Sequence, residues 1–164
     1  MAKKKQTVTN AMRILTAAKI NFETVEYEAE EVTKDFGVYI SQLTGIPTDR
    51  SFKTLVGKGD KTGHIVAVIP ADKEVDLKKL ASVSGNKRVE LIAVKDLLAL
   101  TGYIRGGVSP IGMKKKFPTY IYESCQNYEY VAVSGGVCGV TLKLSPGDLQ
   151  KATDCTFCDI IMKG

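Results

Sequence analysis

GYIRGGVSPIG, at positions 102–112, is the stretch around which the rest of this sequence is organised. It is too rich in glycine for a helix or a strand and too patterned for a linker. Adjacent glycines permit positive φ and let main-chain N–H groups approach a ligand that a Cβ would hold away, Pro110 fixes one φ, and Ser109 adds a hydroxyl. The stretch therefore predicts a binding loop, with a structural turn as the alternative.

The segments on either side of this loop alternate between helical and strand-like patterns. Residues 95–101 are leucine-rich and end at Gly102, so the loop begins at a helix terminus. Working outward, further helices are expected at residues 9–18, 35–43, 76–81 and after Ser145-Pro146, and strands at 22–27, 52–56, 65–69, 88–92, 119–122, 129–133, 140–144 and 157–162. Residues 52–56 and 65–69 should form a hairpin with a mobile tip at 57–63. This intermixing predicts a single α+β domain with a mixed β-sheet, a barrel-like core and surrounding helices.

Length and composition also point to one domain. A chain of 164 residues with 44% hydrophobic content can bury one ordinary core. No apolar run approaches the roughly 18 residues that cross a membrane, and no secretion signal is evident, so we expect a cytoplasmic protein with a basic tail at residues 1–8 and a domain at 9–164. The net charge of +5 leans toward a polyanionic partner. The lysines at 114–116 directly follow the glycine loop, where they could meet phosphates.

The cysteines and the histidine give little support for metal, redox or triad chemistry. Of the four cysteines, Cys125, Cys138, Cys155 and Cys158, only the last two form a CxxC pair, and no second pair stands at zinc-finger spacing. That pair lacks the strand-then-helix context of a thioredoxin-like motif, so we expect reduced structural thiols. His64 has no serine or cysteine partner placed by the sequence and should be an exposed hairpin residue. We expect neither a metal nor a cofactor.

One lysine stands in the middle of a strand-like run, at Lys53 in RSFKTLV (50–56). A strand lysine is ordinarily exposed. The neighbouring Phe52 and Leu55 suggest instead that this one emerges from a packed strand into a cleft, which makes Lys53 the leading candidate for a functional side chain.

Several motifs, in this order along the chain, resemble those of a known family. They are SFKTLV at 51–56, DLKKLA at 76–81, GY at 102–103 with GGVSPIG at 106–112, KKK at 114–116 and VSGG at 133–136. Together they resemble the YbaK/EbsC family, free-standing relatives of the editing domain of bacterial prolyl-tRNA synthetases. The resemblance runs from about residue 9 to the carboxyl end. It implies the fold of that domain and trans-editing, the hydrolysis of mischarged cysteinyl-tRNA(Pro).

The resemblance also implies roles for individual residues. Lys53 becomes the catalytic residue, which holds the terminal adenosine or its phosphate and polarises the ester. Substrate-binding positions are Tyr27, Phe36, Ser51, Thr54, Gly106, Gly107, Ser109, Ser134, Gly135 and Gly136. An activated ester needs mainly a positioned nucleophile and donors for the developing oxyanion, and the main-chain N–H groups of the four glycines suit that task. For a cysteinyl substrate, the substrate's own thiol attacks its carbonyl, so that no cysteine of the protein is essential.

A departure from the family pattern bears on the substrate. Many relatives carry Lys-Arg-Gly and then an acidic residue two positions on, whereas this chain has Val137-Cys138-Gly139 and Thr141. Alanyl-tRNA(Pro) is therefore an alternative substrate, because a hydrophobic pocket separates a methyl from a slightly larger group by only about 1 to 3 kcal/mol. A non-catalytic module that binds an RNA end or a nucleotide is the alternative from another class. The expected partner is the aminoacylated 3′ end of tRNA, with prolyl-tRNA synthetase a family-based expectation and neither DNA nor a membrane.

Overall fold

The computed structural model describes residues 8–28 and 36–163. The helices are α1 (Asn10–Ala17), α2 (Phe36–Thr44), α3 (Leu77–Ser84), α4 (Leu97–Thr101) and α5 (Pro146–Thr153), with the 3-10 turns η1 (Val94–Asp96) and η2 (Glu123–Asn127). The strands are β1 (Glu23–Glu26), β2 (Phe52–Gly59), β3 (Gly63–Pro70), β4 (Val89–Leu91), β5 (Thr119–Tyr122), β6 (Val131–Ser134), β7 (Val140–Leu144) and β8 (Thr156–Cys158). Each helix and strand expected from the sequence is present. Over these described ranges, no helix is long and apolar enough to traverse a lipid bilayer.

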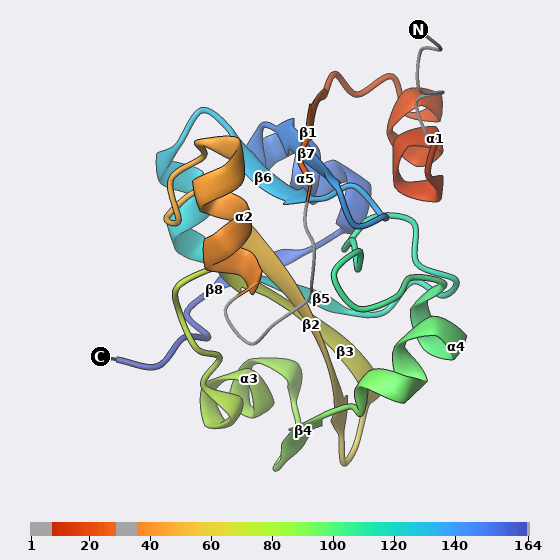
Figure 1. The fold of residues 1–164 in the computed structure, drawn as a ribbon. Coiled ribbons are helices and arrows are strands. Elements are labelled where there is room, and N and C mark those ends of the chain that lie inside the picture. Colours follow the sequence, from red (N-terminus) through yellow and green to blue (C-terminus); the bar gives the residue numbers. More distant parts are fainter. Residues whose placement is uncertain (1–7, 29–35, 164) are drawn as a thin grey trace, which may run out of the picture.

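The strands form two sheets with helices around them (Figure 1). One has five strands in the order β4-β2-β3-β5-β8, and the other has three in the order β1-β7-β6. The five-stranded sheet is mixed, since β2 runs antiparallel to β3 and β4 whereas β5 runs parallel to β3 and β8. The prediction of one α+β domain with a mixed sheet is confirmed. Neither sheet closes on itself within the described residues, so the core lies between two open sheets and not inside a barrel.

Local sequence explains where several helices begin and end. The side-chain oxygens of Thr9, Asp76 and Ser145 accept hydrogen bonds from main-chain N–H groups in the first turns of α1, α3 and α5. Gly85 and Gly102 end α3 and α4 with φ of 78° and 85°. A glycine adopts this left-handed conformation without the steric penalty of a Cβ.

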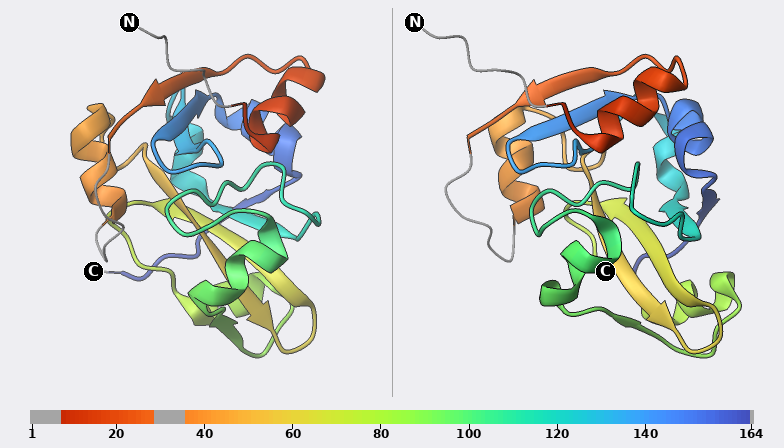
Figure 2. Two further views of the ribbon diagram at one scale, coloured as in Figure 1. Left: turned by 45° about the vertical axis from the view of Figure 1, so that its right-hand side comes forward. Right: turned by 90° about the vertical axis from the view of Figure 1, so that its right-hand side faces the viewer.

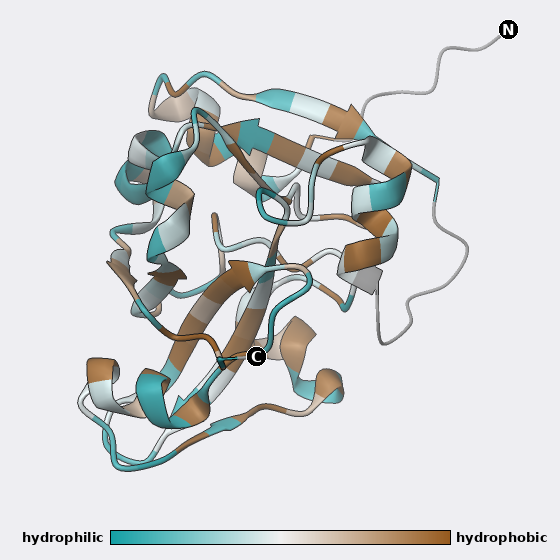
Figure 3. Cartoon of the chain, turned by 90° about the vertical axis from the view of Figure 1, so that its left-hand side faces the viewer, coloured by the Kyte–Doolittle hydropathy of each residue, from teal (hydrophilic) through white to brown (hydrophobic). Residues whose placement is uncertain are grey.

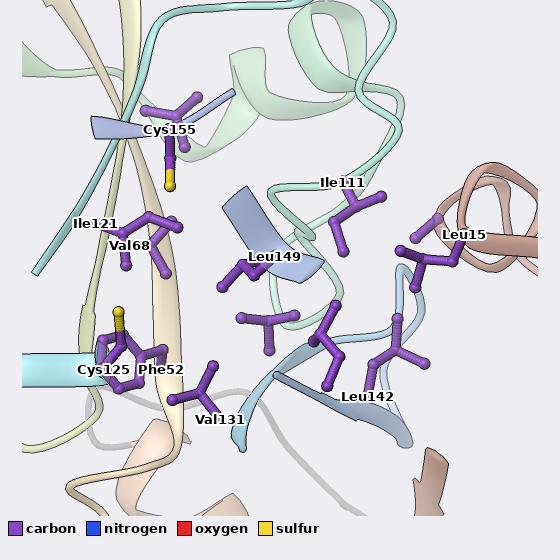
Figure 4. Packing of buried hydrophobic residues seen from close by; sticks show 14 of the residues in the cluster. Leu15, Phe52, Val68, Ile111, Ile121, Cys125, Val131, Leu142, Leu149 and Cys155 are labelled. Atoms are coloured by element: carbon purple, nitrogen blue, oxygen red, sulfur yellow. The ribbon is translucent and has the colours of Figure 1, made fainter. Parts of the chain in front are cut away.

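The main hydrophobic core fills the space between the two sheets. Figure 4 shows side chains from α1, α5 and strands of both sheets meeting there, including Leu15, Phe52 and Leu142. A second cluster lies on the other face of the five-stranded sheet, against α3. Successive residues of β3 alternate between the two clusters, with Val66 in the first and Ala67 in the second. Because both of its faces are covered, β3 is hydrophobic almost throughout (Figure 3).

The two sheets lie one above the other in the further views (Figure 2). The start of β2 is hydrogen-bonded to both of them. The main-chain N–H of Ala132 in β6 donates to the carbonyl of Arg50 at 2.8 Å, and Ser51 forms a parallel bridge with Ala132. The guanidinium of Arg50 also lies 4.8 Å from the ring centroid of Tyr128 and 5.5 Å from that of Tyr130. These contacts hold the three-stranded sheet against one end of β2.

The hairpin tip and the last strand differ from expectation. Strands β2 and β3 pair as far as Gly59 and Gly63, so most of the predicted loop is strand. The remaining turn is hydrogen-bonded to a neighbouring segment, because Oδ1 of Asn86 accepts from the N–H groups of Lys61 and Thr62 at 2.9 and 3.0 Å. The closing strand, expected at 157–162, spans Thr156–Cys158, since its partner β5 ends at Tyr122 opposite Cys158.

The glycine loop at 102–112, the first glycine turn, packs directly on the second glycine turn, which follows β6 at 135–139. A Cβ added at Gly107 would lie 2.9 Å from the main-chain nitrogen of Cys138 and from the Cα of Val137. Gly136 has a φ of 99°, and a Cβ there would lie 2.9 Å from the ring of Tyr103. Glycine is therefore needed at Gly107 because a second segment of main chain approaches too closely for any side chain, and at Gly136 because of its positive φ and the adjacent Tyr103 ring.

The start of α1 joins this contact. The hydroxyl of Thr9 donates to the carbonyl of Gly135 at 2.5 Å, and the amide of Asn10 donates to the carbonyl of Gly112 at 2.6 Å. Both glycine turns are thus anchored to the same helix terminus.

Asn86 should be essential for the stability of the hairpin tip. Asn86→Ala removes the acceptor for two main-chain N–H groups, and we expect the free energy of unfolding to fall by about 2 to 3 kcal/mol. Urea denaturation followed by circular dichroism measures this change. Asn127→Ala, at an exposed position in η2, is the matched control and should leave stability unchanged. Equal urea midpoints for the two variants would disprove the role of Asn86.

The close approach at Gly107 gives a second stability test. Gly107→Ala should lower the free energy of unfolding by about 1 to 3 kcal/mol, because the clash is with main-chain atoms that cannot rotate away. Gly147→Ala, in the first turn of α5 with no atom within 4 Å of the added Cβ, should be neutral or slightly stabilising. Thermal unfolding of both variants compares them, and a Gly107→Ala protein as stable as Gly147→Ala contradicts the packing argument.

Candidate functional site

A cavity opens where β2 lacks a neighbour on one edge. Strand β2 pairs with β3 over its whole length, but with β4 only at residues 57–59. Its other junction on that edge is the bridge from Ser51 to Ala132. Beside the stretch between these junctions lies a cavity of about 330 Å³. Its walls come from β2, the three-stranded sheet, α2, residues 91–97 and the glycine loop.

The cavity brings together predicted residues from distant parts of the chain. Six of the predicted positions line it: Tyr27, Ser51, Lys53, Thr54, Gly106 and Ser134. They come from the end of β1, the start of β2, the first glycine turn and the end of β6. This convergence supports the predicted site, while the individual roles stay predictions.

Other predicted positions do not line this cavity. Ser109 is fully buried, and its hydroxyl accepts a hydrogen bond from the N–H of Ile111 at 3.2 Å. Gly107 and Gly136 lie instead in the contact between the two glycine turns, and Gly135 packs against Val140 of β7. Phe36 begins α2, but its side chain is outside the described residues.

Most of the expected oxyanion donors are already engaged within the protein. The N–H of Gly107 donates to the carbonyl of Ile104 and that of Gly135 to the carbonyl of Val140, both at 2.9 Å. The N–H of Gly136 donates to the hydroxyl of Ser134 at 3.3 Å. In the described part of the chain, Gly106 is the one of the four glycines that lines the cavity and has no recorded hydrogen bond from its N–H.

Two cationic side chains face this cavity. Lys53 is half-buried in its wall, and no carboxylate of the described residues lies within 4.0 Å of the ammonium. Arg105, exposed at the glycine loop, lines the cavity as well. Arg105 was not among the residues predicted from the sequence, although its place directly before Gly106 and Gly107 was a usable signal. Together the two cations favour an anionic or strongly polar ligand.

Hydroxyl groups supply the neutral polar part of the wall. Oγ1 of Thr54 is buried and has no partner among the residues described. Thr141 also lines the cavity, and its hydroxyl donates to the carbonyl of Val133 at 2.9 Å. Thr141 is the position at which the chain departs from the family pattern. It is therefore part of the cavity wall, and it is uncharged here.

Tyr27 connects the cavity to the second glycine turn. Burial is the main cause that raises the pKa of its phenol, and a hydrogen bond with the thiol of Cys138 raises it further. Its main-chain N–H donates to the carbonyl of Gly139 at 2.9 Å. Tyr27 should remain a neutral hydrogen-bonding group at neutral pH.

The remaining thiols are poorly suited to nucleophilic chemistry. No disulfide joins the four cysteines, all of which lie in the described residues. Burial raises the pKa of Cys125 to about 12 and that of Cys158 to about 11, and it also raises the pKa of Cys155. The thiolate is the reactive form, so these thiols are weak nucleophiles at neutral pH. No cluster of three potential metal ligands occurs within the described ranges.

His64 is half-buried and not exposed as expected. Its ring meets that of Phe117 edge-on, with centroids 5.7 Å apart and an interplanar angle of 61°. Phe117 precedes β5, far from the hairpin in sequence, which is why the local pattern around His64 did not reveal the contact.

Comparisons with known proteins agree with this arrangement. The sequence model of a family described as the aminoacyl-tRNA editing domain matches residues 26–152. A protein of Enterococcus faecalis named "Putative Cys-tRNA(Pro)/Cys-tRNA(Cys) deacylase EbsC" is 48% identical over 164 residues, 99% of each chain. Proline--tRNA ligase 1 of Streptomyces avermitilis is 38% identical over 77 residues, which are 46% of this chain and 13% of that enzyme.

A solved structure shares the fold. It is described as "a putative trans-editing enzyme for prolyl tRNA synthetase", and it superposes with a TM-score of 0.81 at 23% identity over 96% of this chain and 100% of that one. The family match spans most of the chain and includes the strands and turns that form the cavity. The protein therefore belongs to the aminoacyl-tRNA editing domain family.

Proposed function

We propose that this protein is a trans-editing hydrolase that removes cysteine from mischarged cysteinyl-tRNA(Pro). The observation that carries the proposal is the half-buried ammonium of Lys53, unpaired among the described residues, in a cavity that also contains Gly106 and a threonine hydroxyl with no partner in the same part of the chain. The substrate class follows from the family and from the name of the Enterococcus faecalis relative.

In the proposed reaction, the protein positions an ester that is already activated. The ammonium of Lys53 and the N–H of Gly106 stabilise the negative charge that develops on the ester carbonyl oxygen. The thiol of the substrate attacks its own carbonyl carbon, the bond to the ribose oxygen breaks, and the thiol proton is transferred to that oxygen. The products are a thiolactone and free tRNA. This route needs no nucleophile from the protein, consistent with the raised pKa values of Cys125, Cys155 and Cys158.

The phosphates of the acceptor end would meet the cations around the cavity mouth. Arg105 lines the cavity, and the side chain of Lys114 lies over Gly102 at the start of the glycine loop. Lys116 instead pairs with Asp154. We therefore expect Arg105 and Lys114 to contribute more to tRNA binding than Lys116.

We also propose the domain bounds, cellular location and protein partner that were expected from the sequence. Residues 1–8 would act as a basic tail on the editing domain at 9–164, in a cytoplasmic protein. Prolyl-tRNA synthetase is the proposed protein partner, because a cavity for an acylated 3′ end carries no means of selecting one tRNA. Alanyl-tRNA(Pro) is the second candidate substrate, and the observation that favours it is the uncharged Thr141 in the cavity wall.

Lys53→Ala should lower kcat/KM for cysteinyl-tRNA(Pro) by about a hundredfold, the scale of losing one group that stabilises an oxyanion. Release of labelled amino acid from tRNA(Pro) charged with cysteine, alanine or proline measures the effect and ranks the substrates. Lys58→Ala, an exposed lysine on the same strand, is the matched control and should retain the wild-type rate. Equal rates for the two variants would refute the role of Lys53, and tight binding without release would instead support the RNA-binding module.

Changing a thiol of the protein and the thiol of the substrate in turn tests which one attacks the ester. Cys138→Ser, which changes the thiol in contact with Tyr27, should leave the rate unchanged. Methylation of the substrate thiol should abolish release, because the sulfur can no longer form the thiolactone. Rapid-quench assays with tRNA(Pro) charged with cysteine or S-methylcysteine provide the measurement. The reverse pattern, with loss in the variant and release of S-methylcysteine, would assign the nucleophile to the protein.

A further inference from the structure

The pairing of β2 with β3 determines which main-chain groups face the cavity. In an antiparallel pair, opposite residues either exchange both hydrogen bonds or exchange none. Val56 stands opposite Val66, the N–H of Val66 donates to the carbonyl of Pro118, and the carbonyl of Val56 accepts from the N–H of Ile92. The main-chain groups of Val56 and Val66 therefore point away from each other.

This orientation recurs at every second residue, so it also applies to Thr54 and Phe52. Thr54 stands opposite Val68, and Phe52 opposite Pro70, which has no N–H to donate. The N–H and C=O groups of Thr54 thus point toward the edge of β2 that lines the cavity.

Neighbouring segments cover this edge on both sides of Thr54 but not at Thr54 itself. On one side Ile92 bonds to Val56, and on the other Ala132 bonds to Arg50. Strand β4 pairs only with residues 57–59. Among the described residues, no strand or bridge pairs with Thr54 along this edge, and its buried Oγ1 is unpartnered as well. Buried polar groups in native proteins are nearly always paired, so the unpartnered Oγ1 beside an open strand edge points to a ligand.

We propose that the aminoacyl group docks on Thr54 as if it were a single residue of an added β-strand. Its α-ammonium donates to the carbonyl of Thr54, and its ester carbonyl accepts from the N–H of Thr54. An aminoacyl ester carries a donor and an acceptor on either side of one Cα, which is the arrangement that exchanges two bonds with an opposite strand residue. This inference rests on the proposed function and adds how the substrate is held.

The docking has two consequences for the reaction. The N–H of Thr54 becomes a further donor to the carbonyl that Lys53 and Gly106 polarise. Because a strand residue projects its side chain to one face of a sheet, L- and D-aminoacyl groups held in this way would direct their side chains to opposite sides. The main chain of β2 would thereby select the L form without contacting the side chain of the amino acid.

Amide hydrogen exchange tests the docking without requiring activity. The probe is cysteine joined through an amide to 3′-amino-3′-deoxyadenosine, which the protein cannot hydrolyse as an ester. The Thr54 amide should exchange rapidly in the free protein and slowly with saturating probe, whereas the Leu55 amide, directed toward β3, should be slow in both. A Thr54 amide that is slow in the free protein, or unaffected by saturating probe, overturns the proposal. A probe without the α-amine should protect Thr54 less, and equal protection contradicts the ammonium contact.

A main-chain substitution tests the same contact in the reaction. Incorporating the α-hydroxy acid analogue of threonine at position 54 replaces the N–H with oxygen and weakens the Lys53 carbonyl as an acceptor for β3, so the thermal midpoint should fall slightly while kcat/KM for cysteinyl-tRNA(Pro) falls about tenfold. The same exchange at Gly147, in the first turn of α5, is the control and should leave kcat/KM unchanged. A wild-type rate for the position 54 variant refutes the docking. If the wild-type protein hydrolyses none of these esters but the probe still protects Thr54, the proposed function fails and the docking stands.

Discussion

The site depends on an interruption in one β-ladder. Strand β2 is held along one edge by β3, and along the other, among the described residues, by β4 at residues 57–59, by Ile92 at Val56 and by β6 at Ser51. An unpaired edge leaves main-chain donors and acceptors that invite another strand. In this protein the open stretch faces a cavity walled by the second sheet, the glycine loop and α2. A small ligand can therefore reach the main chain, while a second protein strand is kept away.

The two glycine turns shape the cavity mainly because they pack closely against each other. Gly107 approaches the main chain of Val137 and Cys138, and Gly136 lies against Tyr103, where a Cβ would clash in each case. Their N–H groups are used inside the protein, so glycine content alone did not identify oxyanion donors. Of the four predicted glycines, Gly106 alone combines a place in the cavity wall with an N–H that no described residue accepts. The rigid contact between the turns fixes where Gly106 stands relative to Lys53.

The sequence was sufficient for features that depend on short-range signals. Thr9, Asp76 and Ser145 cap helices, and Gly85 and Gly102 end them, because each acts on residues within one turn. The strand context of Lys53 also predicted that it faces a cleft, and it lines one cavity with Tyr27, Thr54 and Ser134, while the roles of these residues stay predictions.

The features that the sequence missed depend on contacts between distant segments. The hairpin tip is held by Asn86, and His64 is covered by Phe117, residues that no local pattern links to the hairpin. The open edge at Thr54 depends on strand order, which is not visible before the strands are paired. The N–H groups of Gly107, Gly135 and Gly136 are a separate case, because they are used in local turn bonds that glycine content does not specify. The outline of the site was thus predictable, whereas the donors that can serve a substrate were not.

The most direct measurement of the central claim is a crystal structure of the protein with the non-hydrolysable cysteinyl adenosine amide. The account predicts the aminoacyl group in the cavity beside β2, with its carbonyl oxygen within hydrogen-bonding distance of both the Lys53 ammonium and the Gly106 N–H. An aminoacyl group bound elsewhere on the protein, with this cavity filled only by solvent, would contradict it.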